Sequence, residues 1–426
     1  IIQNKSKENY KQRNGLLLLI LIIIIGSGFL IIGSDSDLIS LPSHRYLNAM
    51  NPFLTTTDPL TDSVSEHATT TLPQSFIFHS ILMIFAGLGV WIILKNPKKY
   101  SYVKNDMISF SLIFGFFGVY VSSTFVRLEV FASLSVIILS SLGLTFLLKE
   151  LFSNKIKDRS AKNFIIKLPF IVGLIILLTI PLVYPIDSNV ISIPKNPPTI
   201  MNGGSTFTIS STDWIDSLEW IKNNTPKDAV IGAWWDYGYW IQTLAERATL
   251  ADNSTTHDGM IKKIAKAFLS SPDEGRDILL EMQADYVLIF ISGQRLSTDN
   301  DGQPLYLLHG GGDESKKYWF MKIADEPLPK YLYSDGISGT DYFWNETLLG
   351  KMTPFTPEAY VNHNNEQSAI YQPGFFPVYS KDIKFPIDEN GPLRLVYTSP
   401  SFDVEKGGTV IGVFVYEINK DYVPLN

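Results

Sequence analysis

The sequence contains no cysteine, few charges and few histidines. Without cysteine, disulfide bonds, thiolate metal sites and thiol nucleophiles are excluded. The six histidines do not fall at a metal-ligand spacing. Charged residues make up 18% of the 426 residues, the net charge is -7, and no basic stretch is interleaved with aromatic residues. We therefore expect no nucleic acid among the partners of this protein.

Long apolar runs are abundant, and nearly all of them lie in the first 185 residues. A membrane helix needs about 20 mostly apolar residues to cross roughly 30 Å of hydrocarbon. Five runs meet this requirement, although buried helices of a large soluble core are the alternative. The predicted spans are Leu16–Ile32, Phe76–Leu94, Met107–Ser122, Phe131–Leu148 and Leu168–Tyr184.

The charges that flank these runs predict their orientation. Clusters of lysine and arginine precede the first run and follow the second and the fourth. With five spans these clusters fall on one side, which the positive-inside rule assigns to the cytoplasm. The loop 33–75 and everything after Pro185 then lie outside. We expect a multi-pass protein of the cell membrane with an extracytoplasmic soluble domain.

After Pro185 the composition is that of a soluble protein. Residues 186–208 predict an irregular linker, because they are rich in Pro, Asn, Gly and Ser. Strand-like segments then alternate with helical ones, which favours an α/β layer structure. Near the C-terminus, 393–398 and 410–418 read as strands. The expected domains are a transmembrane domain 1–185, an extracytoplasmic α/β domain 186–375 and a small β-rich module 376–426.

The most distinctive segment is Trp-Trp-Asp-Tyr-Gly at 234–238. It follows an apolar run at 229–233 that predicts a buried strand, and it precedes a helix-like segment. Two indoles supply N–H donors and Asp236 supplies an acceptor, so the segment is suited to surround a small group with a hydroxyl. The alternative interpretation is that of core aromatics followed by a helix cap.

This pentapeptide resembles the signature of the catalytic subunit of oligosaccharyltransferase. That membrane enzyme transfers a lipid-linked oligosaccharide to the asparagine of Asn-x-Ser/Thr sequons. The resemblance implies the same reaction here, with a lipid-linked oligosaccharide donor, a sequon-containing acceptor protein and the membrane as partners. It also implies acceptor binding by the signature residues, which are Trp234, Trp235, Asp236, Tyr237 and Gly238.

Two further segments are similar to family motifs. Ser-Val-Ser-Glu-His at 63–67 is similar to an external-loop motif whose glutamate is associated with metal and acceptor, which implies a catalytic and metal-binding role for Glu66. Val-Arg-Leu at 126–128 implies that Arg127 contacts the diphosphate of the donor, as a guanidinium can. A solvated Glu66, and an Arg127 that reaches toward water or pairs with Glu129, are the alternatives. The expected cofactor is Mg²⁺ or Mn²⁺.

A third segment, at 312–321, is similar to the family's Asp-x-x-Lys-x-x-x-Met element. The register with Glu314, Lys317 and Met321 supplies the methionine and is preferred here. A register shifted by one residue uses Asp313, Lys316 and Phe320 instead. Positions three and seven apart share one helical face, so we expect a Lys317 and Met321 surface beside the tryptophans.

Family members carry more spans and an external Asp-x-Asp element before the region that this sequence matches. We therefore expect the chain to be the C-terminal part of an archaeal-type enzyme and to be inactive alone. A membrane-anchored extracellular peptide-binding protein without catalysis, or another polyprenyl-phosphate sugar transferase, are the competing hypotheses. Three sequons, at Asn223, Asn253 and Asn345, are possible acceptors but do not identify the enzyme.

Overall fold

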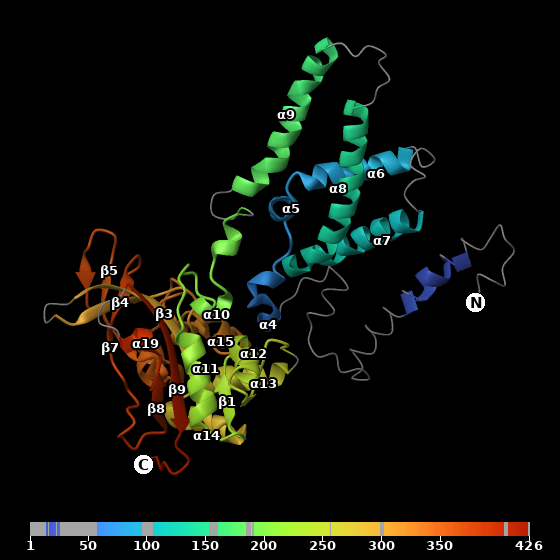
Figure 1. Ribbon diagram of the computed structural model, residues 1–426. Coiled ribbons are helices and arrows are strands. Elements are labelled where there is room, and N and C mark those ends of the chain that lie inside the picture. The colour runs from blue at the N-terminus through green and yellow to red at the C-terminus, as the bar shows by residue number, and fades with distance from the viewer. Residues whose placement is uncertain are drawn as a thin grey trace. The chain divides into compact units, whose positions relative to one another are not determined.

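A computed structural model describes residues 14–15, 17–22, 24–25, 58–95, 105–152, 161–184, 189, 191–255, 257–298, 302–403 and 408–424 (Figure 1). Most of the predicted first span, and residues 33–57 of the predicted external loop, lie outside these residues. The described residues divide into two compact units. The first comprises the described residues from 14 to 75 and 105–135, and the second comprises 76–95 and the described residues from 136 to 424.

The first unit is built from short helical segments and one long apolar helix. Its elements are α4 (Pro59–Asp62), η2 (Ser65–His67), the start of α5 (Leu72–His79), α7 (Asn105–Ser122), η3 (Val126–Leu128) and the start of α8 (Glu129–Phe152). Helix α7 packs closely on α8, because a Cβ at Gly118 would lie 2.6 Å from the backbone N of Ala132. Glycine therefore permits this helix contact.

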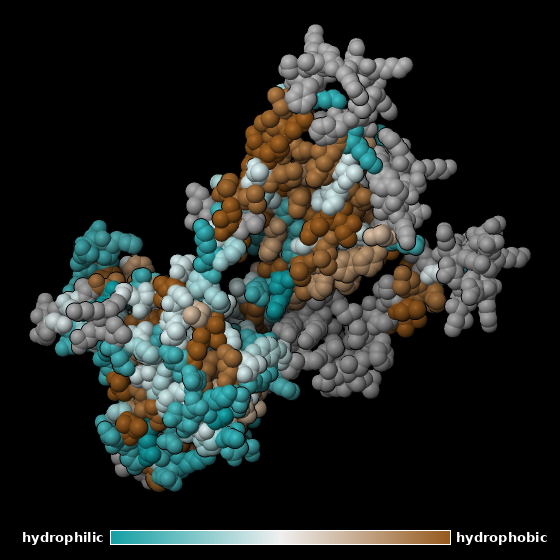
Figure 2. All heavy atoms as spheres, in the orientation of Figure 1, coloured by the Kyte–Doolittle hydropathy of each residue, from teal (hydrophilic) through white to brown (hydrophobic). Residues whose placement is uncertain are grey.

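The second unit begins with apolar helices. These are α6 (Leu82–Lys95), the remainder of α8 and α9 (Ala161–Val183), and α6 and α8 approach each other through Gly89 and Gly143. Figure 2 shows hydrophobic residues gathered over the apolar helices, whereas hydrophilic residues cover much of the sheet domain.

Among the described residues, one helix is long and apolar enough to cross a membrane, over Val126–Lys149. Helices α5 and α6 pass the same test only as a pair, and they meet at an angle of 92°. The run predicted to span 76–94 is therefore bent, since Ser80 adopts a left-handed φ of 50° that ends α5. Ser109–Ser122 and Lys167–Val183 are shorter apolar helices. The arrangement with five spans stays a prediction.

The second unit continues with a nine-stranded mixed sheet centred on β3 (Tyr286–Thr298). Strand β1 (Val230–Ala233) pairs in parallel with β2 (Ala248–Thr249) and with the first half of β3. Strand β9 (Thr409–Ile418) runs antiparallel along the other side of β3. Residues 287–291 of β3 are fully buried, which fits the continuous apolar run that predicted this strand.

The second half of β3 pairs with β4 (Pro304–Leu308), and the sheet continues through β7 (Phe376–Lys381), β5 (Phe355–Val361) and β6 (Gln367–Ser368). Strand β8 (Leu393–Thr398) pairs with β9. The strands predicted near the C-terminus therefore exist. They belong to the same sheet as β1 and β3, so the boundary predicted at 375/376 falls inside one sheet.

Short helices surround the sheet. Helix α11 (Asp213–Asn224) contacts β8 and β9, and α13 (Asp258–Leu269) packs on α15 (Lys317–Ala324). The others are α10 (Thr199–Asn202), α12 (Gly238–Thr243), α14 (Pro272–Glu281), α16 (Leu328–Tyr331), α17 (Asp341–Glu346), α18 (Leu348–Met352) and α19 (Pro400–Asp403), with the 3-10 turns η4 (Ile193–Lys195), η5 (Trp235–Tyr237) and η6 (Asp313–Lys316). Strands alternating with helices confirm the predicted α/β layering of this domain.

Candidate functional site

The segment 234–238 lies at the carboxyl end of the parallel strand β1. The strand ends at Ala233, and the turn η5 leads directly into α12. Gly238 is needed there, because a Cβ would lie 2.4 Å from both Ala251 O and the Cα of Asp252. The segment after β2 therefore packs tightly against this turn. In α/β sheets the carboxyl ends of parallel strands are the usual place for ligands.

The two tryptophans have different surroundings. Trp234 is 2% exposed, and its ring packs edge-to-face on that of Phe320 with 4.4 Å between the ring centres. Trp234 therefore packs as a core residue. Trp235 is also buried, but its indole N–H has no hydrogen-bond partner among the described residues. A buried donor without an acceptor is costly. The indole N–H of Trp235 is therefore a buried donor that lacks an acceptor among the described residues.

Polar groups from η6 meet the same segment. The Tyr237 hydroxyl donates to Asp313 Oδ1 at 2.7 Å, and Asp313 Oδ2 accepts from the Phe290 N–H at 2.8 Å. The Lys316 ammonium donates to Asp236 Oδ2 at 2.6 Å and to the Tyr237 hydroxyl at 2.9 Å. These bonds fix one face of Asp236 and Tyr237 against β3.

Burial and charge set the protonation of this network. Burial raises the pKa of Asp313, and the nearby Lys316 ammonium opposes that shift. Burial alone would lower the pKa of Lys316, but the carboxylates of Asp236 and Asp313 outweigh it and raise that pKa. Burial and the same two carboxylates also raise the pKa of Tyr237. At neutral pH Lys316 is thus a cation and Tyr237 a neutral donor.

The residues of the preferred register of the third motif do not form the expected surface beside the tryptophans. Glu314, Lys317 and Met321 are 2%, 4% and 0% exposed. Lys317 donates to Glu314 O at 2.8 Å and lies 3.3 Å from Glu314 Oε2. These three residues therefore form no surface beside the tryptophans, and Lys317 and Glu314 pair inside the domain.

The shifted register contacts the signature instead. Asp313 bonds Tyr237, Lys316 bonds Asp236, and Phe320 packs on Trp234. The first residues form a 3-10 turn before the α-helix starts at Lys317, so the face of the segment turns relative to one regular α-helix. The spacing of the residues fits both registers. The sequence favours the register with Glu314, because only that one contains a methionine, at Met321.

Glu66 and Arg127 lie together in the first unit. Arg127 Nε is 3.6 Å from Glu66 Oε2, and the side chains are 47% and 62% exposed, respectively. Arg127 Nη1 also lies 3.3 Å from His67 Nε2, while His67 Nδ1 lies 3.1 Å from Thr61 O. Only a neutral His67 with its proton on Nδ1 satisfies both contacts. The pair is thus held in place and open to ligands.

A divalent metal ion needs more ligands than these residues supply. Mg²⁺ prefers six oxygen ligands, and its protein sites use carboxylates. Within the part of the chain that the structure describes, no group of three or more His, Asp or Glu side chains is arranged to hold a metal ion. Glu66 offers a single carboxylate, which is paired with Arg127. The described residues alone do not form the expected Mg²⁺ or Mn²⁺ site.

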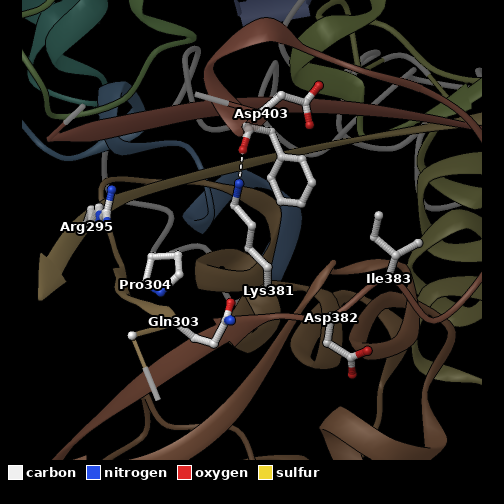
Figure 3. A pocket seen from close by; sticks show the side chains of 9 residues that line it. Arg295, Gln303, Pro304, Lys381, Asp382, Ile383 and Asp403 are labelled. Atoms are coloured by element: carbon white, nitrogen blue, oxygen red, sulfur yellow. Dashed lines mark hydrogen bonds between the residues drawn. The ribbon is translucent and has the colours of Figure 1, made fainter. Parts of the chain in front are cut away.

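The second unit also has a polar cavity of about 790 Å³ away from the signature (Figure 3). Arg295 of β3, Lys381 of β7 and Asp403 of α19 are among its lining residues. Lys381 donates to the Phe402 carbonyl, as the figure shows. None of the predicted site residues lines this cavity.

Comparisons with known proteins agree with these features. A family profile for the STT3/PglB/AglB core domain matches residues 226–289, which include the signature. The dolichyl-diphosphooligosaccharide–protein glycosyltransferase subunit stt-3 of Caenorhabditis elegans is 25% identical over 330 residues, 68% of this chain and 41% of the relative. The subunit stt3 of Schizosaccharomyces pombe is 27% identical over 334 residues, 69% of this chain and 42% of the relative.

Among solved structures, the apo Archaeoglobus fulgidus oligosaccharyltransferase matches with a TM-score of 0.51 and 14% identity. The match covers 91% of this chain and 44% of that one. The fold is thus shared with membrane glycosyltransferases of this type. The chain is similar to the catalytic subunits of oligosaccharyltransferases over their C-terminal part, which confirms the resemblance. It spans less than half the length of these relatives.

Proposed function

We propose that this chain is the acceptor-binding part of an oligosaccharyltransferase. The reaction transfers an oligosaccharide from a polyprenyl (di)phosphate to the side-chain amide of Asn in Asn-x-Ser/Thr. The observation that carries the proposal is the arrangement at 234–238. A buried, unpartnered indole N–H lies in the same turn as a carboxylate that a lysine holds from one side.

This arrangement suits the hydroxyl of the sequon. The Trp235 N–H donates to the hydroxyl oxygen, and the hydroxyl donates to the Asp236 oxygen that Lys316 does not occupy. Such a site selects strongly for its ligand, because an acceptor without the hydroxyl leaves the buried N–H unpaired. Trp234, Tyr237 and Gly238 shape this pocket. Asp313, Lys316 and Phe320 hold it against the sheet.

Glu314, Lys317 and Met321 support the same pocket from within the domain. Their side chains are buried inside the domain, and the residues just before them in the chain, Asp313, Lys316 and Phe320, contact the signature. The Lys317 ammonium also lies 5.7 Å from the centre of the Phe343 ring, which anchors the start of α15. In this proposal they position Lys316 and Phe320 and do not contact the acceptor.

Glu66 and Arg127 serve the chemical step. In that step the bond between the sugar C1 and the phosphate oxygen breaks, and its electron pair stays on the leaving phosphate. A bond from C1 to the amide nitrogen forms, and the amide proton is released to solvent. An amide nitrogen is a poor nucleophile, so a Glu66 carboxylate that accepts from the NH2 group assists it. Arg127 stabilises the charge that develops on the leaving diphosphate.

A bound Mg²⁺ or Mn²⁺ would share the stabilisation of the leaving group. Glu66 is the ligand that this chain offers, and the remaining carboxylates would come from the N-terminal part of the enzyme. The protein would act in the cell membrane as a multi-pass protein, with its sheet domain on the extracytoplasmic side. We also propose that the enzyme is of the archaeal type.

The test uses the complete enzyme and sequon peptides. Trp235→Phe removes the N–H and keeps an aromatic ring, so we expect peptide affinity to fall about tenfold or more. Trp319→Phe is a matched control, since Trp319 lies outside the contacts of the signature. Equal affinity of the Trp235 variant and the wild type for Asn-x-Thr peptides would refute this reading of the pocket.

A peptide-binding protein without catalysis remains the second candidate, because the same pocket would serve it. Glu66 and Arg127 separate the two, since the proposal gives this half-exposed pair its role in the transfer step, which a binding protein does not perform. In the complete enzyme, Glu66→Gln and Arg127→Ala should reduce glycan transfer by about 100-fold or more while peptides still bind. Unchanged transfer in both variants would favour the binding protein.

A further inference from the structure

Asn253 lies in the segment between β2 and α13 and bonds the backbone of the signature, whereas Lys316 bonds its side chains. Its Nδ2 donates to the backbone O of Asp236 at 2.9 Å, and its Oδ1 accepts from the Tyr239 N–H at 3.2 Å. These two backbone groups belong to residues i and i+3, the pair that a β-turn joins. One side-chain amide therefore bridges both ends of the turn that carries Asp236, Tyr237 and Gly238.

The segment that presents Asn253 is itself fixed. Asp252 Oδ1 accepts from the Ser254 N–H at 2.9 Å, and Gln242 Nε2 of α12 donates to Asp252 Oδ2 at 3.3 Å. Ala251 and Asp252 also pack where a Cβ of Gly238 would stand. The bridge from Asn253 thus connects two rigid pieces of backbone and does not depend on a flexible loop.

Asn253 is also the first residue of an Asn-Ser-Thr sequon, but the fold uses it differently. The third residue, Thr255, is 4% exposed and has a left-handed φ of 49°. Both ends of the Asn253 amide are already bonded to backbone. The sequon pattern therefore coincides with a structural requirement for asparagine, which offers a donor and an acceptor on one planar group.

We propose that Asn253 is a positioning residue that sets the geometry of Asp236 for the acceptor hydroxyl, an inference that rests on the proposed function. Asp236 is then held twice, its backbone by Asn253 and its carboxylate by Lys316. With both held, the free carboxylate oxygen keeps one position relative to the Trp235 N–H. Recognition of a hydroxyl needs such fixed geometry.

The experiment compares kinetics of the complete enzyme with Asn-x-Thr and Asn-x-Ser peptides. Asn253→Ala should raise KM for the Asn-x-Thr peptide about tenfold, with kcat changed less than about twofold, because only acceptor geometry is lost. The KM for the Asn-x-Ser peptide should also rise, because both peptides present a hydroxyl to Asp236. Asn253→Asp should not rescue KM, since it keeps an acceptor for the Tyr239 N–H and turns a carboxylate oxygen toward the Asp236 carbonyl.

Thr255→Val is the matched control, because it destroys the sequon and leaves Asn253 in place. We expect its KM to be close to that of the wild type and mass spectrometry to find wild-type Asn253 unmodified. Wild-type KM in Asn253→Ala, or an equal rise in Thr255→Val together with a glycan on Asn253, would overturn the inference. A wild-type enzyme that transfers no glycan would instead refute the proposed function, and thermal melting confirms that each variant is folded.

Discussion

At the scale of residues, the acceptor pocket depends on charges that compensate one another. Lys316 faces Asp236 and Asp313, and it lies over the Tyr237 ring with its ammonium 4.8 Å from the ring centre. Its side chain is 20% exposed and that of Asp313 is fully buried. A buried ion pair adds little net stability to the folded protein, because burying the charges costs free energy. Removing one partner is nevertheless destabilising, since the other charge is left buried and uncompensated.

Lys316→Met should therefore lower both the stability of the protein and its affinity for acceptor peptides. We expect the free energy of unfolding to fall by about 3 kcal/mol, because Asp236 and Asp313 lose their cation. Peptide affinity should fall about tenfold, because Asp236 is no longer oriented. Lys322→Met is the control on the same helix, since Lys322 is exposed. Peptide titration followed by tryptophan fluorescence measures the affinity, and wild-type affinity in Lys316→Met would contradict this role.

The sequence predicted the segment 234–238 at the centre of this network, but not which residues of the third motif contact it. Trp234 to Gly238 followed from residue types alone, and the expected strand-to-helix change is observed. The partner register did not follow, because Asp-x-x-Lys spacing fits both 313/316 and 314/317. Only the 3-10 turn before α15 decides which side chains face the signature.

At the scale of elements, a buried lysine joins the end of α18 to the sheet. Lys384 follows β7, and its ammonium donates to Thr353 O at 2.9 Å and Phe355 O at 2.7 Å, with Gly350 O at 3.5 Å. The carbonyls of Gly350 and Thr353 lie at the end of α18, where a cation is favoured, and that of Phe355 begins β5. Burial nevertheless lowers the pKa of Lys384 from 10.5 to about 8.

This shift predicts a pH dependence of stability. Between pH 8 and 10.5 the unfolded chain binds more protons at Lys384 than the folded one, so the stability contributed by this group rises with pH. Below pH 8 the cost of burying the charge is fully present. From pH 7 to 9.5 we expect a gain of about 2 kcal/mol from this residue. Thermal unfolding in detergent at each pH measures it.

Lys384→Met provides the comparison for that measurement. Methionine has a similar length and no charge, so the part of the pH dependence that comes from this residue should disappear. The variant also leaves three carbonyls without their donor, which lowers stability at every pH. Identical slopes of stability against pH in the variant and the wild type would contradict the assignment to Lys384.

At the scale of the whole molecule, the chain carries the proposed acceptor pocket in one compact unit and the Glu66 and Arg127 pair in the other. The described residues supply one candidate metal ligand from the predicted set, and the chain spans less than half of its relatives. Under the proposed function, this chain therefore binds the acceptor, and the remaining metal ligands come from the N-terminal part of the enzyme.

The chain on its own should bind acceptor peptides without glycosylating them. We expect Asn-x-Thr peptides to bind in detergent, with an affinity lost in Trp235→Phe, because Trp235, Asp236 and Lys316 all lie in the second unit. Transfer should need the N-terminal part of the enzyme and its carboxylates. Gel-shift assays with a lipid-linked oligosaccharide measure transfer, and a glycosylated peptide from this chain alone would contradict the prediction.

The sequence by itself determined the class of the protein. Local patterns are sufficient for apolar helices, for a buried strand such as β3, and for a segment as specific as Trp-Trp-Asp-Tyr-Gly. Tertiary structure decided what depends on contacts between distant residues. It joined the C-terminal strands to the central sheet, placed Asp313 and Lys316 on the signature, and brought the amide of Asn253 to the backbone of Asp236. Spacing along a chain does not encode such contacts, because they depend on how separate elements pack.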